Sequence, residues 1–460
     1  MVEDATDGSL AKVLSRWQLF AIGFGAIVGW GWIIQMGYWV NEAGPIGSLV
    51  AFAVGSILVL LMCLIYGELS SAMPYAGGEL HYSKRAFGIK SSFACSWGLL
   101  LGYVGVVAFQ AIALGVAIAY LIPHFQTFPL WTILGEPVYG SVVAVGILGV
   151  FIITYLNYRG VDPTAQFQLI LVAIIILAAI ILITGSFTVA PTVKNAPFGN
   201  AGLAGIAIVA IQVPGLFSGF AIIPQTAEEA DMHPRSIGTV IVAVIFSVTL
   251  FYAITFWAVG QSVPVSKLAD SLVPAATAMA TVFNSAIAGK LMTLAGIAAL
   301  LTSWSSFLIG ASRLIYAMAE SNMLPESLAH IHPKYNTPSR AIVLIGVITA
   351  IAPLLGEQMI SSIINADSLG FVFSWIIVSG SFLYLRYTEP EMERPFKLPG
   401  GYLIGGLGLI ASVLFLRLYL PGAPSALVWP KDWAIVSLWS LLGIGFFIYT
   451  RWTTIPDSNT

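Results

Sequence analysis

Long apolar stretches constrain the fold of this chain more than any other feature of its sequence. A membrane-spanning helix needs about 20 mostly apolar residues, and we expect twelve such spans. They lie at 17–40, 47–73, 92–122, 138–157, 165–187, 202–226, 237–260, 285–319, 340–355, 360–386, 402–420 and 433–451. The sequence therefore predicts an all-α integral membrane protein with twelve transmembrane helices.

The composition supports this class and excludes others. Hydrophobic residues make up 58% of the chain and charged residues only 9%, whereas a soluble domain carries about 25% charged residues. The 19 Lys and Arg against 21 Asp and Glu leave no basic surface for nucleic acid. Cys63 and Cys95 both lie in apolar runs, so we expect neither a disulfide framework nor a thiolate metal site.

Lys and Arg in the short loops predict the orientation, because cytoplasmic loops carry an excess of both. With a cytoplasmic N-terminus, the residues on the inside are Lys12, Arg16, Lys84, Arg85, Lys90, Arg159, Arg235, Arg313, Lys334, Arg340, Arg386, Arg394, Lys397 and Arg451. Lys194, Lys267, Lys290 and Lys431 fall outside, and Arg417 lies within the eleventh span. We therefore expect both termini in the cytoplasm and place the protein in the plasma or inner membrane.

Two spans contain glycine and proline in patterns that interrupt a helix. The first carries GFGAIVGWGW at 23–32 and the sixth carries VPGLFSGF at 213–220. One such pattern is explained by close helix packing. A matched pair five spans apart, however, is typical of an inverted-repeat transporter, in which broken helices line a binding site near the bilayer midplane.

The chemistry of a broken helix suggests the ligand. Unwinding leaves N–H groups on one half-helix and C=O groups on the other without partners. A zwitterion satisfies both, because its carboxylate accepts from the N–H groups at the positive end of a half-helix and its ammonium donates to the carbonyls.

Six sequence motifs resemble those of the amino acid–polyamine–organocation superfamily, in particular its amino-acid permeases. They are Gly25-Ala-Ile-Val-Gly29-Trp-Gly31, the run from Gly67-Glu68 to Gly78-Glu79, Asn157-Tyr-Arg-Gly160, Gly219-Phe220 with Ala227-Glu-Glu229, Ser312-Arg-Leu-Ile-Tyr-Ala-Met-Ala319, and Arg394-Pro-Phe-Lys-Leu-Pro-Gly400. The resemblance implies a cytoplasmic tail at 1–16, inverted repeats at 17–200 and 201–400, and two further helices with a tail at 401–460. It also implies alternating access around a central site.

The resemblance assigns candidate residues to that site. It places the carboxylate-binding turn on Gly29, Trp30 and Gly31. The carbonyls that face the ammonium fall on Ile27, Gly215 and Ser218. This chain departs from the family because Trp30 stands where a small residue is usual and Gly215 where an aromatic gate is common, so Phe217 and Phe220 are candidates for the gate.

Individual residues leave alternatives open. Trp30 and Trp32 are candidates for an aromatic wall around an ammonium, although packing between helices is the alternative for both. Asp367 in the tenth span and Glu68 in the second are possible proton or cation sites. We expect Glu68, Glu79 and the pair Glu228–Glu229 to form cytoplasmic gate contacts with Arg85, Arg235 or Arg313. The five histidines lie in expected loops, and we expect no metal site or other cofactor.

The coupling ion is a choice between sodium and a proton. In some relatives a lysine in the fifth span occupies the place of a sodium ion, but that position here is Ile175. Candidate sodium ligands are the carbonyls of Gly25 and Val28 with the hydroxyls of Ser305 and Ser306. The alternative is that these hydroxyls bond their own backbone. We favour sodium over a lysine-based mechanism.

The leading functional hypothesis is a secondary active transporter for amino acids, with a small-molecule substrate and the lipid bilayer as its partners. An importer or exchanger of amines such as ethanolamine or polyamines is the second hypothesis. The third is a sensor that binds the ligand without moving it. We expect no enzymatic activity, because no catalytic constellation of Ser, His, Cys and Asp falls within the spans.

Overall fold

The computed structural model describes residues 10–189, 193, 195–199, 201–423 and 426–453. Lys194, which the charge pattern places on the outside, lies beyond these residues. The same holds for 1–9 and 454–460, which make up most of the two predicted tails.

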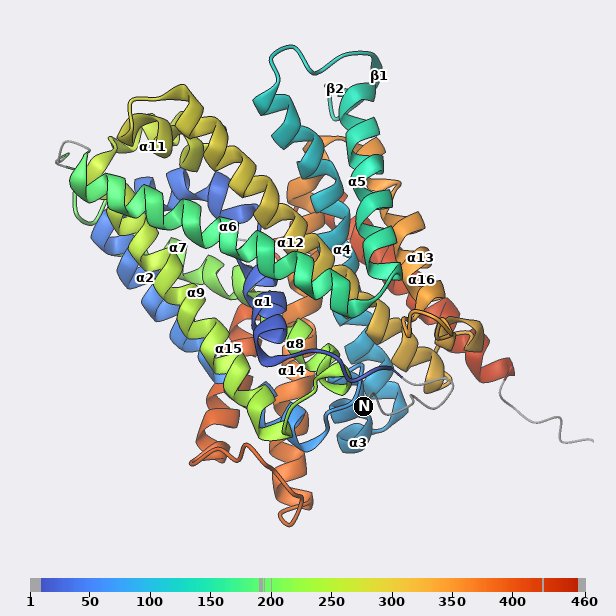
Figure 1. Cartoon of the computed structure of the whole chain (residues 1–460). Coiled ribbons are helices and arrows are strands. Elements are labelled where there is room, and N and C mark those ends of the chain that lie inside the picture. The colour runs from blue at the N-terminus through green and yellow to red at the C-terminus, as the bar shows by residue number, and fades with distance from the viewer. Residues whose placement is uncertain (1–9, 190–192, 194, 200, 424–425, 454–460) are drawn as a thin grey trace, which may run out of the picture.

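The described chain is mostly helical (Figure 1). Short 3-10 helices carry the letter η. In chain order the elements are α1 (Arg16–Ile27), α2 (Gly31–Ala72), α3 (Glu79–Phe87), α4 (Ile89–Leu121), β1 (Pro129–Ile133), β2 (Glu136–Tyr139), α5 (Gly140–Tyr158), α6 (Val161–Thr188), α7 (Gly202–Leu216), η1 (Phe217–Ala221), α8 (Ile222–Gln225), η2 (Ala227–Glu229), α9 (Pro234–Ser262), α10 (Val265–Ala269), α11 (Pro274–Val282), α12 (Ala286–Glu320), η3 (Glu326–Ala329), α13 (Ser339–Thr349), η4 (Ala352–Leu355), η5 (Glu357–Met359), α14 (Ile360–Thr388), α15 (Gly401–Tyr419) and α16 (Lys431–Thr453).

Ten helices within the described residues are long and apolar enough to cross a membrane. This supports the prediction of a helical, multi-pass membrane protein, but the number differs from the twelve predicted spans. The difference arises at two places, the first span and the ninth.

The predicted first span, 17–40, is divided between two helices. α1 has 12 residues and is therefore about 18 Å long, too short to cross a hydrocarbon core of about 30 Å. The span continues in α2, whose 42 residues are kinked at Gly44, where φ is +72°. A side chain at Gly44 would collide with the backbone of Gly199. The kink divides α2 into 31–43 and 45–72, and the second part matches the predicted second span.

The predicted ninth span, 340–355, is a short helix followed by a 3-10 turn. α13 ends at Thr349, and η4 continues the segment to Leu355. Pro353 lacks the N–H that a regular helix needs, and Gly356 turns the chain with a φ of +73°. The apolar segment Ser339–Leu355 is therefore shorter than the other spans.

A small β-hairpin, which the sequence analysis did not predict, interrupts the otherwise helical chain. β1 and β2 pair antiparallel, with Ile133 opposite Glu136. The two residues between them, Leu134 and Gly135, have φ values of +52° and +90°, as a tight two-residue hairpin turn requires. The helix that follows consequently begins at Gly140, not at 138 as predicted.

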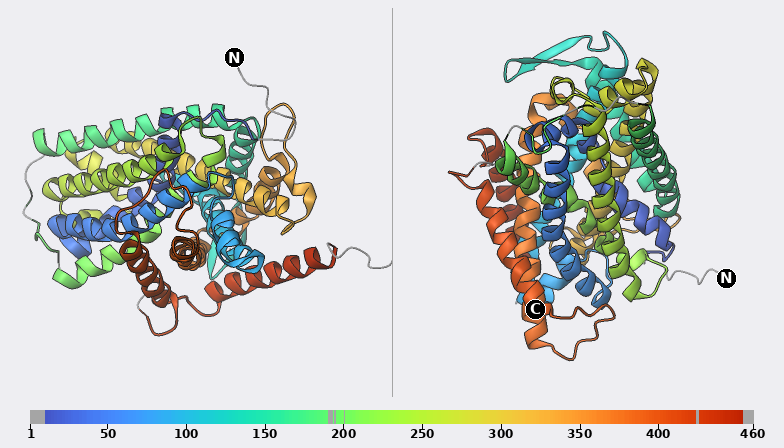
Figure 2. Two further views of the ribbon diagram at one scale, coloured as in Figure 1. Left: turned by 90° about the horizontal axis from the view of Figure 1, so that it is seen from below. Right: turned by 90° about the vertical axis from the view of Figure 1, so that its left-hand side faces the viewer.

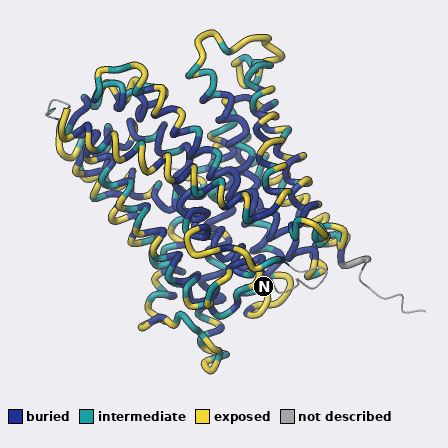
Figure 3. The backbone as a smooth tube through the Cα atoms, in the orientation of Figure 1, coloured by how far each residue is buried: buried dark blue, intermediate teal, exposed yellow. Residues whose placement is uncertain are grey.

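The hairpin and α3 mark opposite ends of the molecule (Figures 1 and 2). We call these the hairpin end and the α3 end. Large apolar side chains such as Ile170, Phe246 and Leu441 are exposed on the outer helices, while the buried backbone runs through the centre (Figure 3). In a bilayer, such exposed apolar side chains face lipid instead of water.

Candidate substrate-binding site

A cavity of about 1270 Å³ leads from the hairpin end to the middle of the molecule. Near the hairpin end its wall includes His124 and Gln126, both exposed to solvent. At its deep end the wall includes Ala26 from α1 and Ser218 from η1. The cavity thus joins both interrupted helices to one end of the molecule.

The first interruption lies between α1 and α2, at residues 28–30. The N–H groups of Trp30 and Gly31 have no backbone acceptor among the described residues, and both residues line the cavity. They stand at the positive end of the α2 dipole, a position that favours an anion. This part of the site therefore has the donors that a carboxylate needs.

The carbonyl group of Ile27 differs from what we expected. Ile27 lines the cavity, but its C=O already accepts from the N–H of Gly29 at 3.0 Å. It also accepts from the hydroxyl of Tyr252 at 3.2 Å. These bonds leave it less available to an ammonium group than the sequence suggested.

Two glycines at this interruption differ in the space around them. A Cβ at Gly29 would lie 3.0 Å from Cβ and Oγ of Ser303 in α12. A Cβ at Gly31 would lie 3.4 Å from the flexible end of Leu216, which is ordinary contact. A side chain at position 29 would thus have to push Ser303 of α12 aside, whereas position 31 has room for a methyl group.

The two tryptophans of this segment lie in different surroundings. Trp30 lines the cavity. Its ring would also be the nearest neighbour of a Cβ added at Gly296 in α12. Trp32 is fully buried and meets Phe251 edge to face at 5.2 Å. Of these two rings, Trp30 is therefore the one placed to touch a substrate.

The second interruption lies at η1, slightly later than Pro214 suggested. Pro214 is still inside α7, and the 3-10 segment begins at Phe217. Gly215 and Ser218 both line the cavity as expected. A Cβ at Gly215 would find its nearest neighbour, Ser368 Oγ, 3.8 Å away, so this wall is open for a ligand.

Phe217 and Phe220 are fully buried and belong to the core, not to the cavity wall. The Phe220 ring stacks on Trp375 at 5.8 Å. The aromatic residues that do line the cavity include Phe307 and Phe371, whose rings are 6.1 Å apart. The sequence offered no signal for these two because both look like ordinary core residues.

Gln110 in α4 is a site residue that the sequence analysis missed. It lines the cavity and is fully buried. Neither Nε2 nor Oε1 has a hydrogen-bond partner among the described residues. Its Nε2 would lie 3.6 Å from a Cβ at Gly29, so the amide stands beside the α1–α2 interruption. A buried amide without a partner is costly, and a polar ligand in the cavity would remove that cost.

Asp367 in α14 also faces the cavity. Its side chain is buried, Oδ1 accepts from the Ser368 hydroxyl at 3.1 Å, and Oδ2 has no partner among the described residues. It forms no ion pair with any described residue. A buried carboxylate of this kind suits a cationic ligand group or a proton.

Polar contacts close the molecule at the α3 end. Arg313 and Glu229 form a buried ion pair, with 2.8 Å between Nε and Oε2. The Tyr103 hydroxyl donates to the carbonyl of Ala221 at 3.1 Å. None of these four residues lines the cavity. These four residues lie between the deep end of the cavity and the α3 end of the molecule. Among the described residues, the cavity is therefore open toward the hairpin end.

Comparison with known proteins agrees with this architecture. The sequence model of the family described as "Amino acid permease" matches residues 14–450. The chain belongs to this family. The predicted resemblance is thereby confirmed, as are the predictions of an amino acid transporter and of a function other than enzymatic catalysis.

Several curated proteins are similar to the permease over most of their length. The branched-chain amino acid permease BcaP of Bacillus subtilis is 26% identical over 97% of this chain and 95% of its own. The methylthioribose transporter of the same organism is 26% identical over 96% and 94%. The aspartate-proton symporter of the same organism is 26% identical over 89% and 79%.

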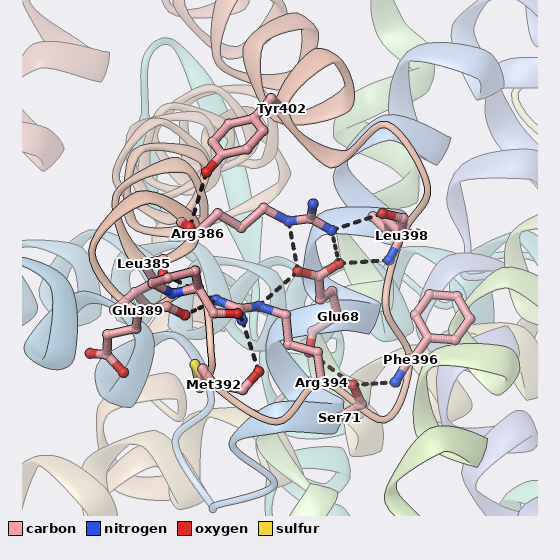
Figure 4. A network of polar contacts seen from close by, with 11 residues as sticks. Glu68, Ser71, Leu385, Arg386, Glu389, Met392, Arg394, Phe396, Leu398 and Tyr402 are labelled. Carbon is pink, nitrogen blue, oxygen red and sulfur yellow. Dashed lines mark hydrogen bonds and ion pairs between the residues drawn. The ribbon is translucent and has the colours of Figure 1, made fainter.

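Figure 4 shows where Glu68 of the permease lies. Its carboxylate accepts from Arg386 Nε at 2.9 Å and from the backbone N–H of Leu398 at 2.8 Å. Arg394 Nε lies 3.1 Å from Oε1. Phe396 donates its N–H to Ser71 Oγ at 3.1 Å. Glu68 therefore fixes the loop after α14 to the end of α2 and lies away from the cavity.

The other predicted gate contacts are partly present. Glu229 pairs with Arg313 as expected, whereas Glu228 accepts from the N–H of Ala76 at 2.9 Å. Arg85 pairs with Glu389, a partner that the sequence did not suggest. Among the described residues, no group of His, Cys, Asp and Glu is arranged to hold a metal ion.

Hydrogen bonds engage both candidate hydroxyl ligands of sodium and one of the two candidate carbonyls. Ser306 donates to the carbonyl of Ile22 at 2.9 Å, while Ser305 accepts from Asn157 of α5 at 3.1 Å. The carbonyl of Gly25 accepts from Thr302, not from either serine, at 3.3 Å. Val28 is buried outside the cavity wall. The place of a lysine in relatives is occupied by Ile175, which is fully buried in α6.

Proposed function

We propose that the permease binds its amino acid at the deep end of the cavity and moves it by alternating access, driven by an ion gradient. The unpartnered N–H groups of Trp30 and Gly31, with the unpartnered amide of Gln110, carry this proposal. Together they offer hydrogen-bond donors to one carboxylate beside the positive end of α2. The open wall formed by Gly215 of α7 and Ser218 of η1, both of which line the cavity, supports binding of the ammonium there.

Thermal unfolding of the purified permease tests the substrate class, because a ligand that binds only the folded state raises Tm. We expect neutral amino acids to raise Tm and their decarboxylated amines to raise it much less. Equal shifts would favour the amine transporter. Binding of an amino acid without uptake into proteoliposomes would favour the sensor.

Asp367 supports the second candidate function, transport of an amine or of a cationic amino acid. Its unpartnered Oδ2 faces the cavity, and a buried carboxylate pairs well with an ammonium. Lysine is a cationic amino acid and cadaverine is its decarboxylated amine. The shift in Tm that each causes in the same unfolding assay distinguishes transport of a cationic amino acid from transport of an amine. A larger shift for cadaverine would replace the amino-acid proposal with the amine proposal.

We further propose that the chain crosses the membrane twelve times as a five-plus-five inverted repeat with two added helices. In this arrangement α1 with 31–43 forms the first crossing, 45–72 the second, and α13 with η4 the ninth. The interruptions at 28–30 and 217–221 then fall on crossings one and six, which supports the repeat.

The proposed orientation has the α3 end in the cytoplasm and the hairpin end outside. The contacts that close the α3 end include the cations Arg313, Arg386 and Arg394. This agrees with the excess of positive charge that is usual on the cytoplasmic side. In this orientation the structure is open to the outside. In a cysteine-free background, Leu134→Cys should react with an impermeant maleimide on intact cells and Lys84→Cys should not; the reverse pattern would overturn the orientation.

We propose a proton, and not sodium, as the coupling ion. The name of one relative, the aspartate-proton symporter of Bacillus subtilis, supports this proposal, and so does the buried carboxylate of Asp367 in the cavity wall. Asp367 is the proposed proton acceptor. Uptake into proteoliposomes should respond to an imposed proton gradient and not to a sodium gradient. Stimulation by sodium that is lost in Ser306→Ala would restore the sodium hypothesis.

A further inference from the structure

Glu79 is a buried carboxylate that the site described above does not use. It is the first residue of α3 and is fully buried. Oε2 accepts a hydrogen bond from the side-chain amide of Gln225, and Oε1 has no partner. Among the described residues it forms no ion pair. The charge of an ionised Glu79 would therefore be stabilised by hydrogen-bond donors but by no cation among the described residues.

The groups that face Glu79 are all neutral near pH 7. They are Tyr66 of α2, Tyr82 of α3, Cys95 and Tyr103 of α4, and Gln225 of α8.

The cations on the neighbouring helices are engaged elsewhere. Arg313 of α12 pairs with Glu229, and Arg386 of α14 pairs with Glu68. Burial raises the pKa of Glu79 to about 8, although its backbone N–H and the side chains of Tyr66 and Gln225 oppose that rise. A proton on the carboxyl thus avoids the high cost of burying an unpaired charge.

Glu79 also touches a part of the chain that alternating access must move. Gln225 ends α8, the half of the broken helix nearer the α3 end. Gly78 lies against the same half-helix, where an added Cβ would be 3.0 Å from Pro224 Cβ. Any movement of α8 that opens the α3 end separates Gln225 from Glu79 and admits water to the carboxyl.

We propose that Glu79 is a proton-binding site that makes opening of the α3 end depend on pH. In the closed form Glu79 is a neutral acid. When the α3 end opens, the carboxyl O–H bond breaks, the proton passes to water on that side, and a solvated carboxylate remains. Closure reverses both steps. The inference rests on the proposed function, since it assumes that this end opens during transport.

The direction of the pH effect follows from proton linkage. The closed form binds the proton more tightly than the open form, in which a solvated Glu has a pKa of about 4.3. The closed form is therefore fully favoured below about pH 4.3, and this advantage is lost progressively as pH rises toward the folded pKa of about 8. Raising the pH within this window should promote opening.

Cys95 provides a natural reporter of this opening. It is buried beside Glu79, and replacing Cys63 with Ser leaves it as the single thiol. Alkylation of Cys95 by a small maleimide is compared between this protein and its Glu79→Gln variant. Because the thiolate fraction itself rises with pH, the measured quantity is the ratio of the two rates at each pH.

We expect the alkylation rate of the parent, divided by that of Glu79→Gln, to exceed one at pH 6 and to rise about tenfold or more between pH 6 and pH 8.5, since opening releases the Glu79 proton throughout this window. Glu389→Gln is the matched control. The Arg85 guanidinium beside Glu389 holds the pKa of that exposed carboxyl below its usual range, so Glu389 does not titrate between these pH values. In the Glu389→Gln variant, Cys95 should be alkylated at the same rate as in the parent at both pH values.

A ratio that does not change with pH would overturn the proposal. Failure of Glu79→Gln to fold would also overturn it, because glutamine is the neutral, equally sized equivalent of the proposed protonated acid. Thermal unfolding supplies a second readout, in which the parent should lose stability relative to Glu79→Gln as pH rises. Neither readout requires a substrate, so failure of the transport proposal would be seen separately, in uptake assays.

Discussion

Arg313 of α12 and Glu229 of η2 meet through two parallel hydrogen bonds, although 84 residues separate them in the chain. The distances are 2.8 Å from Nε to Oε2 and 2.9 Å from Nη2 to Oε1. The side chains are only 1% and 0% exposed. This geometry fixes η2, directly after the broken helix, to the end of α12 and thereby helps to close the α3 end.

Removing one partner of this pair should strongly destabilise the permease. Arg313→Met leaves Glu229 buried without a cation, which costs about 3–5 kcal/mol. Met at both positions should recover much of that loss. Thermal unfolding measures both variants. Arg85→Met is the control, since it breaks an exposed pair with Glu389 worth less than about 1 kcal/mol. A larger effect at Arg85 than at Arg313 would contradict this account.

The two glycines of the first interruption should respond differently to added side chains. Gly29→Val places a side chain against Ser303 and should abolish ligand binding and uptake. Gly31→Ala should retain both, because its methyl group makes only ordinary contact with Leu216. Ligand-induced shifts in Tm compare the variants. Loss of binding in Gly31→Ala with retention in Gly29→Val would contradict the difference in space that the structure shows beside these two glycines.

Gln110→Leu should weaken binding of amino acids while leaving the fold intact. The change removes a buried amide without partners, so stability should stay the same or rise. The lost hydrogen bond to the carboxylate should raise KM about 10- to 100-fold. Radiolabelled uptake measures KM, and Gln166→Leu on the exposed side of α6 is the control. An unchanged KM would remove Gln110 from the site.

Asp367→Asn should separate coupling from binding. Asparagine keeps the size of Asp367 but holds no negative charge, so uptake driven by a proton gradient should fall at least about tenfold. Exchange of internal for external amino acid, which needs no net proton movement, should continue. If exchange and driven uptake fall equally, Asp367 binds the substrate instead of the proton.

Properties that depend on local composition were predictable from the sequence. Apolar stretches without charge identify a multi-pass membrane protein, because lipid accepts hardly any other segment. Glycine and proline near 28–31 and 214–219 indicated both interruptions for a similarly local reason, since glycine weakens a helix and proline removes a helical N–H. The motif around Glu229 and Arg313 even suggested their pairing.

Partner choice and side-chain direction were decided by the tertiary structure alone. Glu68 meets Arg386 and Arg394 across more than 300 residues of sequence, and no local pattern distinguishes these arginines from Arg85. Gln110 faces the cavity because α4 packs with that side toward the first interruption. The physical reason is general: composition determines that a segment enters the membrane, whereas the packing of all helices determines which of its side chains meet a partner, the lipid or the substrate.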